Sequence, residues 1–238
     1  MYFFFSGEGP TDLGTSKDQP GPLVLVADQI ISEHQGYSFL ESQCAVFIHP
    51  AALERIKPDL RTPPRSPGLR GLKTPAENRM HRKDAHALAH ASSEHVKNYP
   101  DKEFVAVLFR DSNSPDENEW KKTRESMFNG FRDHSNNDRG VAAVARPVSE
   151  AWWLSAIYRK EDNNKNCKYL ESTNRGGETD HALKVELETK LGTTPSRAVL
   201  NDMVADREID YTLIDSESFL AFRRDFEIAV GLGHLHYT

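Results

Sequence analysis

Carboxylate side chains that follow apolar segments are the residues of this sequence best suited to chemistry. Glu8 and Asp12 lie four residues apart in a turn-rich segment after the first apolar run, and Asp111 and Glu150 follow two later apolar runs. Carboxylate oxygens are the ligands that Mg²⁺ prefers, and phosphodiester hydrolysis with two metal ions needs carboxylates from several chain segments. The four residues therefore predict a divalent-metal site for phosphodiester cleavage.

Two further oxygen donors follow Asp111 in the same polar segment. Asn113 offers a neutral amide oxygen, which binds a hard cation more weakly than a carboxylate does, and Asp116 offers a full carboxylate. Taken singly, each acidic residue also has an ordinary explanation, because Asp and Asn are common in turns and the helix dipole favours Glu150 at a helix start. The metal hypothesis depends on three strand ends acting together.

The elements that must position these carboxylates alternate between strands and helices. Short apolar runs predict buried strands at 2–5, 44–48, 104–109 and 141–145, and helical spacing or capping signals predict helices beginning near residues 23, 74, 120, 150, 182, 195 and 216. This alternation predicts an α/β fold with a mainly parallel sheet of about four strands flanked by helices. Parallel strands end at one edge, so we expect Glu8, Asp111 and Glu150 to lie together there.

The domain organisation is expected to be simple. Residues 1–160 are predicted to form the catalytic domain, and residues 161–238 a helical C-terminal extension packed on the same domain. Residues 55–75 are basic and proline-rich, which excludes a continuous helix and predicts an inserted loop. This loop either tracks a phosphate backbone, because Lys and Arg give affinity without sequence preference, or forms a solvated surface.

Composition narrows the class of protein. The formal net charge of −6 excludes a globally basic nucleic-acid-binding protein, so any such affinity must come from a local patch. No apolar run approaches the roughly 20 residues that a membrane-spanning helix needs, and the short apolar start lacks the features of a signal peptide. The two cysteines, Cys44 and Cys167, form no disulfide framework. A cytoplasmic location without membrane association is expected.

Three motifs resemble a known family. Gly7–Asp12 reads GEGPTD after a first apolar strand, Val107–Asn113 reads VLFRDSN, and Arg146–Leu154 reads RPVSEAWWL. These segments resemble the TOPRIM domain of the overcoming-lysogenization-defect (OLD) nuclease group, and the chain looks closest to small, stand-alone OLD-like bacterial proteins. The resemblance extends from residue 2 to about residue 225. The first and third motifs are the specific ones.

The resemblance implies a Rossmann-like TOPRIM fold that cleaves DNA or RNA with Mg²⁺ or Mn²⁺. Glu8 would bind metal or act as a general base, and Asp12, Asp111 and Glu150 would be ligands. The family's second motif is normally Asp-x-Asp, so this sequence departs from it at Asn113. Either Asp116 substitutes, or Asn113 binds weakly, or catalysis has been lost.

Basic residues late in the chain are further candidates, because OLD nucleases place one near the scissile phosphate. Arg197 is the first candidate, with Lys184 and Lys190 as alternatives, and a solvated helix charge is the ordinary explanation for each. His86 and His90 have the i,i+4 spacing of a metal pair, but no third ligand has convincing spacing, so a polar helix face is favoured.

The family also implies a partner. OLD nucleases carry an ATPase domain, and this sequence has no Gly-x-x-x-x-Gly-Lys-Ser/Thr loop. The resemblance therefore implies a separate ABC/SMC-type ATPase subunit and a role in bacterial antiphage defence. The competing hypothesis is a regulatory or scaffolding subunit that keeps the fold with a weakened metal site.

Overall fold

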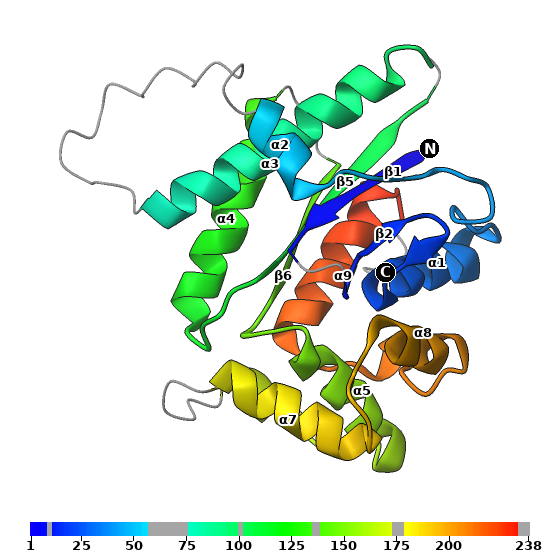
Figure 1. The fold of residues 1–238 in the computed structure, drawn as a ribbon, viewed down its shortest axis with the longest axis vertical. Helices are drawn as coiled ribbons and strands as arrows, with labels where there is room; N and C mark the ends of the chain where they lie inside the picture. The colour runs from blue at the N-terminus through cyan, green and yellow to red at the C-terminus, as the bar shows by residue number, and fades with distance from the viewer. Residues whose placement is uncertain (9–10, 57–75, 100–101, 135–138, 173–178, 233–238) are drawn as a thin grey trace.

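A four-stranded parallel sheet is the centre of the fold. The computed structural model describes residues 1–8, 11–56, 76–99, 102–134, 139–172 and 179–232. The sheet strands are β1 (Tyr2–Gly7), β4 (Ala45–Phe47), β5 (Phe104–Asp111) and β6 (Gly140–Ala145), hydrogen-bonded in the order β4-β1-β5-β6 (Figure 1). The predicted α/β class, with about four parallel strands flanked by helices and a helical C-terminal region, is confirmed.

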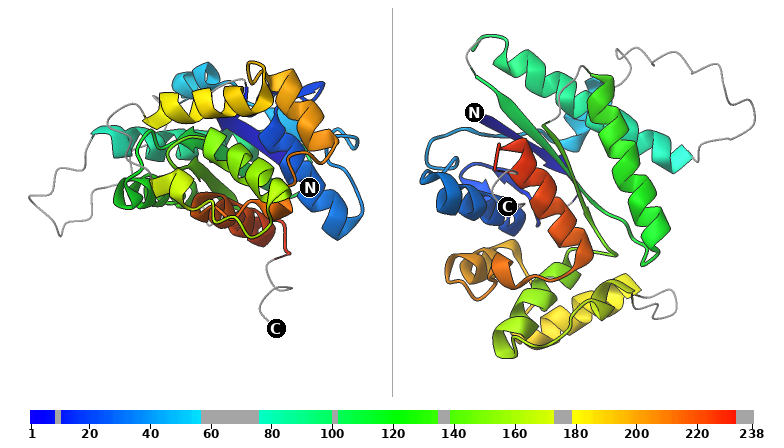
Figure 2. Two further views of the ribbon diagram at one scale, coloured as in Figure 1. Left: turned by 90° about the horizontal axis from the view of Figure 1, so that it is seen from below. Right: turned by 180° about the vertical axis from the view of Figure 1, so that it is seen from behind.

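Helices cover both faces of this sheet, which is why its strands read as continuous apolar runs. Phe3, Phe5 and Phe109 face the larger core, which includes buried residues of α1 (Pro22–Gln35), α5 (Glu150–Glu161) and α9 (Glu217–Ala229). Phe4 and Leu108 face the smaller core, formed with α2 (Pro50–Ile56), α3 (Ala76–Val96) and α4 (Glu117–Asp133). Figures 1 and 2 show α9 and α1 on one side of the sheet and α3 and α4 on the other.

The C-terminal helices share the larger core rather than forming a separate one. These elements are α6 (Tyr169–Ser172), α7 (Thr179–Leu191), α8 (Arg197–Ala205), a 3-10 turn (Tyr211–Leu213) and α9. Leu183 and Leu187 of α7 and Phe222 of α9 are buried in that core. Helix α9 packs on β6, α8 on α1 and α7 on α5. The sheet and the segment after residue 160 are therefore continuous in their packing.

Local structure differs from the sequence-based expectation in three places. A small hairpin, β2 (Gly14–Ser16) with β3 (Gln19–Pro20), lies in a segment expected to be loop. Gly14 has a φ of +83°, and a Cβ there would lie 2.1 Å from the carbonyl oxygen of Gln19, so only glycine fits the turn. Helix α2, which begins at Pro50, and the short helix α6 were not predicted. The basic segment at 57–75 lies outside the described residues.

In the ranges that the structure describes, no helix combines the length and the apolar character needed to cross a bilayer.

Candidate active site

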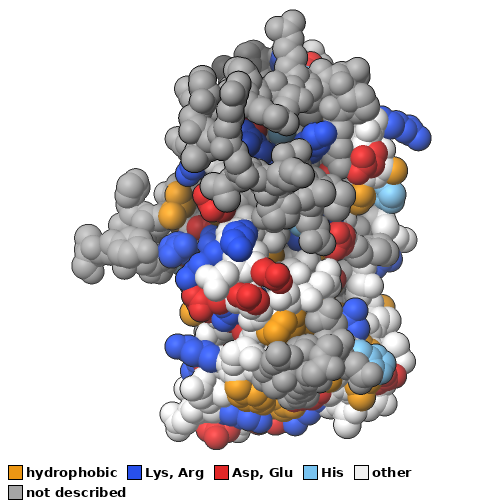
Figure 3. All heavy atoms as spheres, turned by 90° about the vertical axis from the view of Figure 1, so that its left-hand side faces the viewer, with side chains coloured by type: hydrophobic (Ala, Val, Ile, Leu, Met, Phe, Trp, Pro, Cys, Tyr) orange, Lys and Arg blue, Asp and Glu red, His pale blue; other side chains and the backbone are white. Residues whose placement is uncertain are grey.

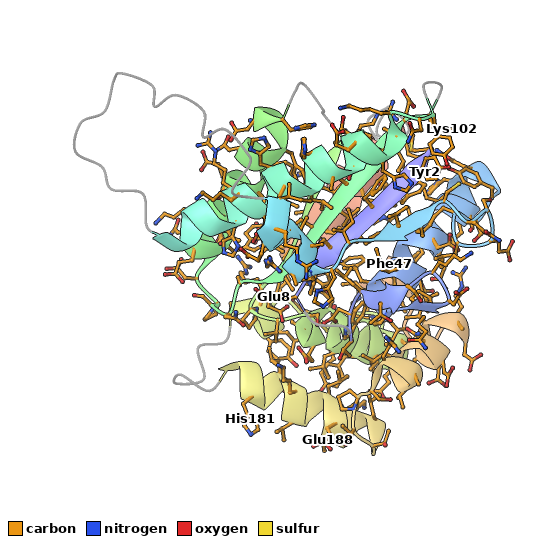
Figure 4. The ribbon with its side chains drawn as sticks, turned by 45° about the horizontal axis from the view of Figure 1, so that its top comes forward. Tyr2, Glu8, Phe47, Lys102, His181 and Glu188 are labelled. Atoms are coloured by element: carbon orange, nitrogen blue, oxygen red, sulfur yellow. The ribbon has the colours of Figure 1, made fainter. Side chains whose placement is uncertain are left out.

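Three chain segments deliver acidic residues to the carboxyl edge of the sheet. Asp111 is the last residue of β5, Glu150 begins α5 just after β6, and Glu8 follows β1. The backbone N–H of Glu8 donates to the carbonyl oxygen of Phe109 over 3.3 Å, which places Glu8 beside the end of β5. Figure 4 shows Glu8 at the end of the sheet that is nearer to α7, the helix on which His181 and Glu188 are labelled. The predicted edge is the one that the fold builds.

Asp12, Asp111 and Glu150, named here the acidic cluster, influence one another electrostatically. Burial raises the pKa of Asp111 to about 8, with the negative charges of Asp12 and Glu150 as further causes. Burial also raises the pKa of Asp12. Carboxyl groups that lose solvation and repel one another are driven toward the neutral form. The acidic cluster therefore concentrates negative charge that the protein alone does not compensate fully.

The start of α5 holds two members of this cluster in place. The backbone N–H of Ser149 donates to Asp111 Oδ1 over 3.1 Å. Side-chain hydrogen bonds from Ser149 and Trp153 to Asp12 lower the pKa of that carboxyl, although burial outweighs them. Ser149 occupies the N-cap position of α5, but its side chain makes no capping hydrogen bond. The hydroxyl of Ser149 hydrogen-bonds to Asp12 instead.

Among the three basic candidates, Lys184 of α7 is the one that acts on the acidic cluster. Its positive charge lowers the pKa of both Asp12 and Asp111, although burial dominates each shift. Arg197 donates from Nη2 to Gln19 Oε1 over 3.3 Å at the start of α8. Lys190 pairs with Glu161 at 2.6 Å. The first choice from the sequence, Arg197, thus has a different partner, and the alternative Lys184 is placed to serve the site.

The two oxygen donors after Asp111 have local structural roles. Asn113 is exposed and adopts a left-handed conformation with a φ of 53°, and its N–H donates to the carbonyl oxygen of Pro147 over 3.0 Å. Asp116 is the N-cap of α4, and its Oδ1 accepts from the N–H of Asn118 over 2.7 Å. The carboxylate of Asp116 therefore has a capping function that competes with metal binding.

Glu8 reaches the same edge of the sheet but has a cationic neighbour of its own. Its Oε1 lies 3.6 Å from Nε of Arg110, and its side chain is 49% exposed. Arg110 in turn donates to Asp84 of α3. The four-carboxylate arrangement expected from the sequence thus divides into the three-membered acidic cluster and a Glu8–Arg110 pair.

The donor chemistry of the acidic cluster is of the kind that a hard divalent cation prefers. In the described ranges, however, no group of three or more His, Cys, Asp or Glu side chains has the arrangement of a metal site. The donors at this edge are nonetheless oxygens from separate segments, as Mg²⁺ requires. A bound cation would also relieve the burial and repulsion that raise the pKa values of Asp12 and Asp111.

Sequence reasoning missed the polar partners of the carboxylates. Ser149 and Trp153, which hydrogen-bond to Asp12, and Arg110, which lies beside Glu8, were not predicted as partners of these carboxylates. Arg110 left one signal, since a charged residue at the end of an apolar strand needs a partner when buried. Comparisons of the chain with protein-family models, with curated proteins and with solved structures find no match.

Proposed function

We propose that this protein is a divalent-metal-dependent nuclease that cleaves nucleic-acid phosphodiesters at the acidic cluster. The observation that carries the proposal is the convergence of Asp12, Asp111 and Glu150 from three segments, close enough for Asp12 and Glu150 to raise the pKa of Asp111. Such concentrated negative charge at the carboxyl edge of a parallel sheet is costly to folding. A function that uses a cation accounts for that cost.

The proposed roles follow from the contacts. Asp12, Asp111 and Glu150 would hold Mg²⁺ or Mn²⁺, which when bound supplies charge stabilisation and a more acidic water. Ser149 fixes Asp111 through its N–H, so this carboxylate cannot rotate freely. Lys184, whose charge acts on the cluster, would contact an anionic phosphate oxygen. Glu8 would bind metal or act as a general base.

Protons and metal compete at this site. Because the pKa of Asp111 is about 8, its carboxyl is largely protonated at neutral pH when no cation is present. A cation that binds there must displace the proton. We therefore expect the affinity for Mg²⁺ or Mn²⁺ to rise with pH up to about 8, with proton release on binding.

The distribution of charged side chains bears on how the substrate would be recognised. On the face seen in Figure 3, Lys and Arg side chains are interspersed with Asp and Glu among the described residues. This mixture and the net charge of −6 favour a locally recognised phosphate over a broad electrostatic surface. The choice between DNA and RNA is left to experiment. The ABC/SMC-type ATPase partner and the antiphage role rest on the OLD resemblance alone.

A cleavage assay tests the proposal. Single- and double-stranded DNA and RNA are incubated with the protein and Mg²⁺ or Mn²⁺, with and without ATP and a co-expressed ATPase. Cleavage that EDTA abolishes, and that Glu8→Gln and Asp111→Asn reduce by at least about a hundredfold, supports the proposal. Cleavage that persists in EDTA or in Asp111→Asn contradicts it.

One observation favours the competing function of a regulatory or scaffolding subunit. Asn113 stands where the family pattern has a second Asp, and it is exposed with its N–H bound to Pro147. A weakened metal site is the expected consequence. Mn²⁺ binding without cleavage of any nucleic acid, alone or with an ATPase, would support this alternative.

A further inference from the structure

Arg110 lies next to the acidic cluster but on the opposite face of the sheet. Side chains alternate along a strand, so Phe109 packs in the larger core and Leu108 in the smaller one. Asp111 accordingly meets Ser149 on the side of α5, whereas Arg110 meets α3. Both residues occupy the carboxyl end of β5. A buried positive charge therefore lies directly behind the proposed metal site.

Asp84 of α3 anchors this guanidinium. Arg110 Nη2 donates to Asp84 Oδ2 over 2.8 Å, and the two residues are only 5% and 2% exposed. A buried, charge-assisted hydrogen bond of this kind is strong and directional. One corner of the guanidinium is consequently fixed in position.

The other donors of Arg110 are not used in the same way. Its Nε and Nη1 are buried and have no hydrogen-bond partner among the described residues. A buried donor without a partner is costly and rare in folded proteins, so such atoms indicate a function or a partner that binds there. Nε lies 3.6 Å from Oε1 of Glu8, just beyond hydrogen-bond distance. A small movement of the Glu8 side chain would close that contact.

The backbone of Glu8 is hydrogen-bonded, whereas its side chain has only a long contact with Arg110. Gly7 pairs with Phe109 in the sheet register, so the next residue, Glu8, follows opposite Arg110. The hydrogen bond from its N–H to Phe109 holds the backbone, but the side chain is half exposed. Ordering a half-exposed side chain costs conformational entropy. The guanidinium of Arg110, 3.6 Å away, supplies a charge that favours one position of the Glu8 carboxylate.

We propose that Arg110 is a positioning residue, anchored by Asp84, that holds the Glu8 carboxylate at the sheet edge for the cation bound by the acidic cluster. This inference rests on the proposed metal-dependent function. Arg110 touches neither the acidic cluster nor the substrate. It acts through Glu8, in the way that outer partners orient the ligands of a metal.

The competing explanation is that Arg110 only neutralises Asp84. Arg110→Lys separates the two explanations, because an ammonium can still pair with Asp84 but lacks the planar fork that reaches two carboxylates at once. Arg82→Lys is the matched control, since Arg82 lies in the same helix as Asp84 and pairs with Asp133 at 2.6 Å.

The test is a double-mutant cycle on Mn²⁺ affinity, measured by titration calorimetry at pH 8. We expect Glu8→Gln and Arg110→Lys each to weaken binding by about tenfold. The double variant should bind no more weakly than the weaker single variant, because both changes remove one positioned carboxylate. Arg82→Lys should bind as the wild type does. If Arg110→Lys does not fold, Arg110→Gln with Asp84→Asn replaces it, and the same coupling to Glu8 is expected.

The outcomes separate this inference from the proposed function. Losses that multiply in the double variant, or an Arg110→Lys variant with wild-type affinity, would overturn the positioning role and leave the nuclease proposal standing. A wild-type protein that binds no Mn²⁺ would overturn the proposed function and this inference with it.

Discussion

The N–H of Ser149 donates to Asp111 Oδ1 over 3.1 Å and so ties the last residue of β5 to the start of α5. The same serine reaches Asp12 through its side chain. One residue between β6 and its following helix therefore links two carboxylates that come from separate segments. The geometry of the acidic cluster depends on this junction as much as on the carboxylates.

The charge of Asp111 should make the metal-free protein less stable as pH rises. Its pKa is raised to about 8 in the folded state from an ordinary value of 3.8, so between these values the folded state binds more protons than the unfolded state. Stability should thus fall between about pH 4 and pH 8, at about 1.4 kcal/mol per unit of pKa shift before coupling is considered. Asp111→Asn keeps an acceptor for Ser149 and should melt at an equal or higher temperature at pH 8 in EDTA. A large loss of stability would identify Asp111 as a structural turn residue.

Asn113→Asp should strengthen divalent-metal binding if residue 113 faces the cation. Aspartate tolerates the left-handed conformation that Asn113 adopts, so the fold should be retained. Unit charges 4 Å apart in water interact by about 1 kcal/mol, and a divalent cation doubles this, so we expect about thirtyfold tighter binding of Mg²⁺ or Mn²⁺. Titration calorimetry measures it. Unchanged affinity for both ions would mean that residue 113 points away from the metal.

Lys184→Met should reduce cleavage by at least about tenfold without changing Mn²⁺ affinity to the same extent. Lys184 acts on Asp12 and Asp111, and a phosphate oxygen bound near them would lose a cationic partner. Lys190→Met is the control on the same helix, because Lys190 pairs with Glu161. Single-turnover rates on the best substrate decide between them. Equal losses of cleavage rate in the two variants would mean that the substitutions act by disturbing the packing of α7 and not through the charge of Lys184.

Two histidines at the α3–α4 interface, His86 and His134, should make the protein less stable in acid. The ring of His134 lies 5.8 Å from that of His86 and 5.2 Å from that of His90. Burial lowers the pKa of His86 and of His134. For His86, the charges of His90 and Arg82 lower the pKa further, and Asp133 opposes them. For His134, the charges of His90, His86 and Lys97 lower the pKa further, and Glu94 opposes them.

The sign of this effect follows from the lowered pKa values. The folded state binds fewer protons than the unfolded state. The contribution of these histidines to the free energy of unfolding is therefore fully present above about pH 6.5, the ordinary histidine pKa, and is lost as the pH falls from there through their lowered pKa values. His134→Gln should show a smaller drop in melting temperature between pH 7.5 and pH 5, measured by circular dichroism. A drop equal to that of the wild type would show that these rings titrate without linkage to folding.

The sequence could predict which carboxylates share an edge, because that follows from parallel strands. Asp111 and Glu150 lie where the apolar runs of β5 and β6 indicated. The choice of Lys184 over Arg197 could not be predicted, since it depends on how α7 packs against α5, a long-range contact without a local signal. The hairpin at Gly14 and the side-chain role of Ser149 were missed for a similar reason. Each residue also fits a common local explanation, a turn or a helix cap.

Because the strand is pleated at Arg110 and Asp111, the register of β5 determines which face of the sheet receives the positive charge and which receives the negative one. Because these neighbours point to opposite faces, a one-residue deletion earlier in β5 would send the guanidinium toward Ser149 and the carboxylate toward Asp84. The edge would then hold the guanidinium beside Asp12 and Glu150, and α3 would face two acids, Asp84 and Asp111. Length changes within β5 should therefore be selected against more strongly than changes of residue type within its apolar run.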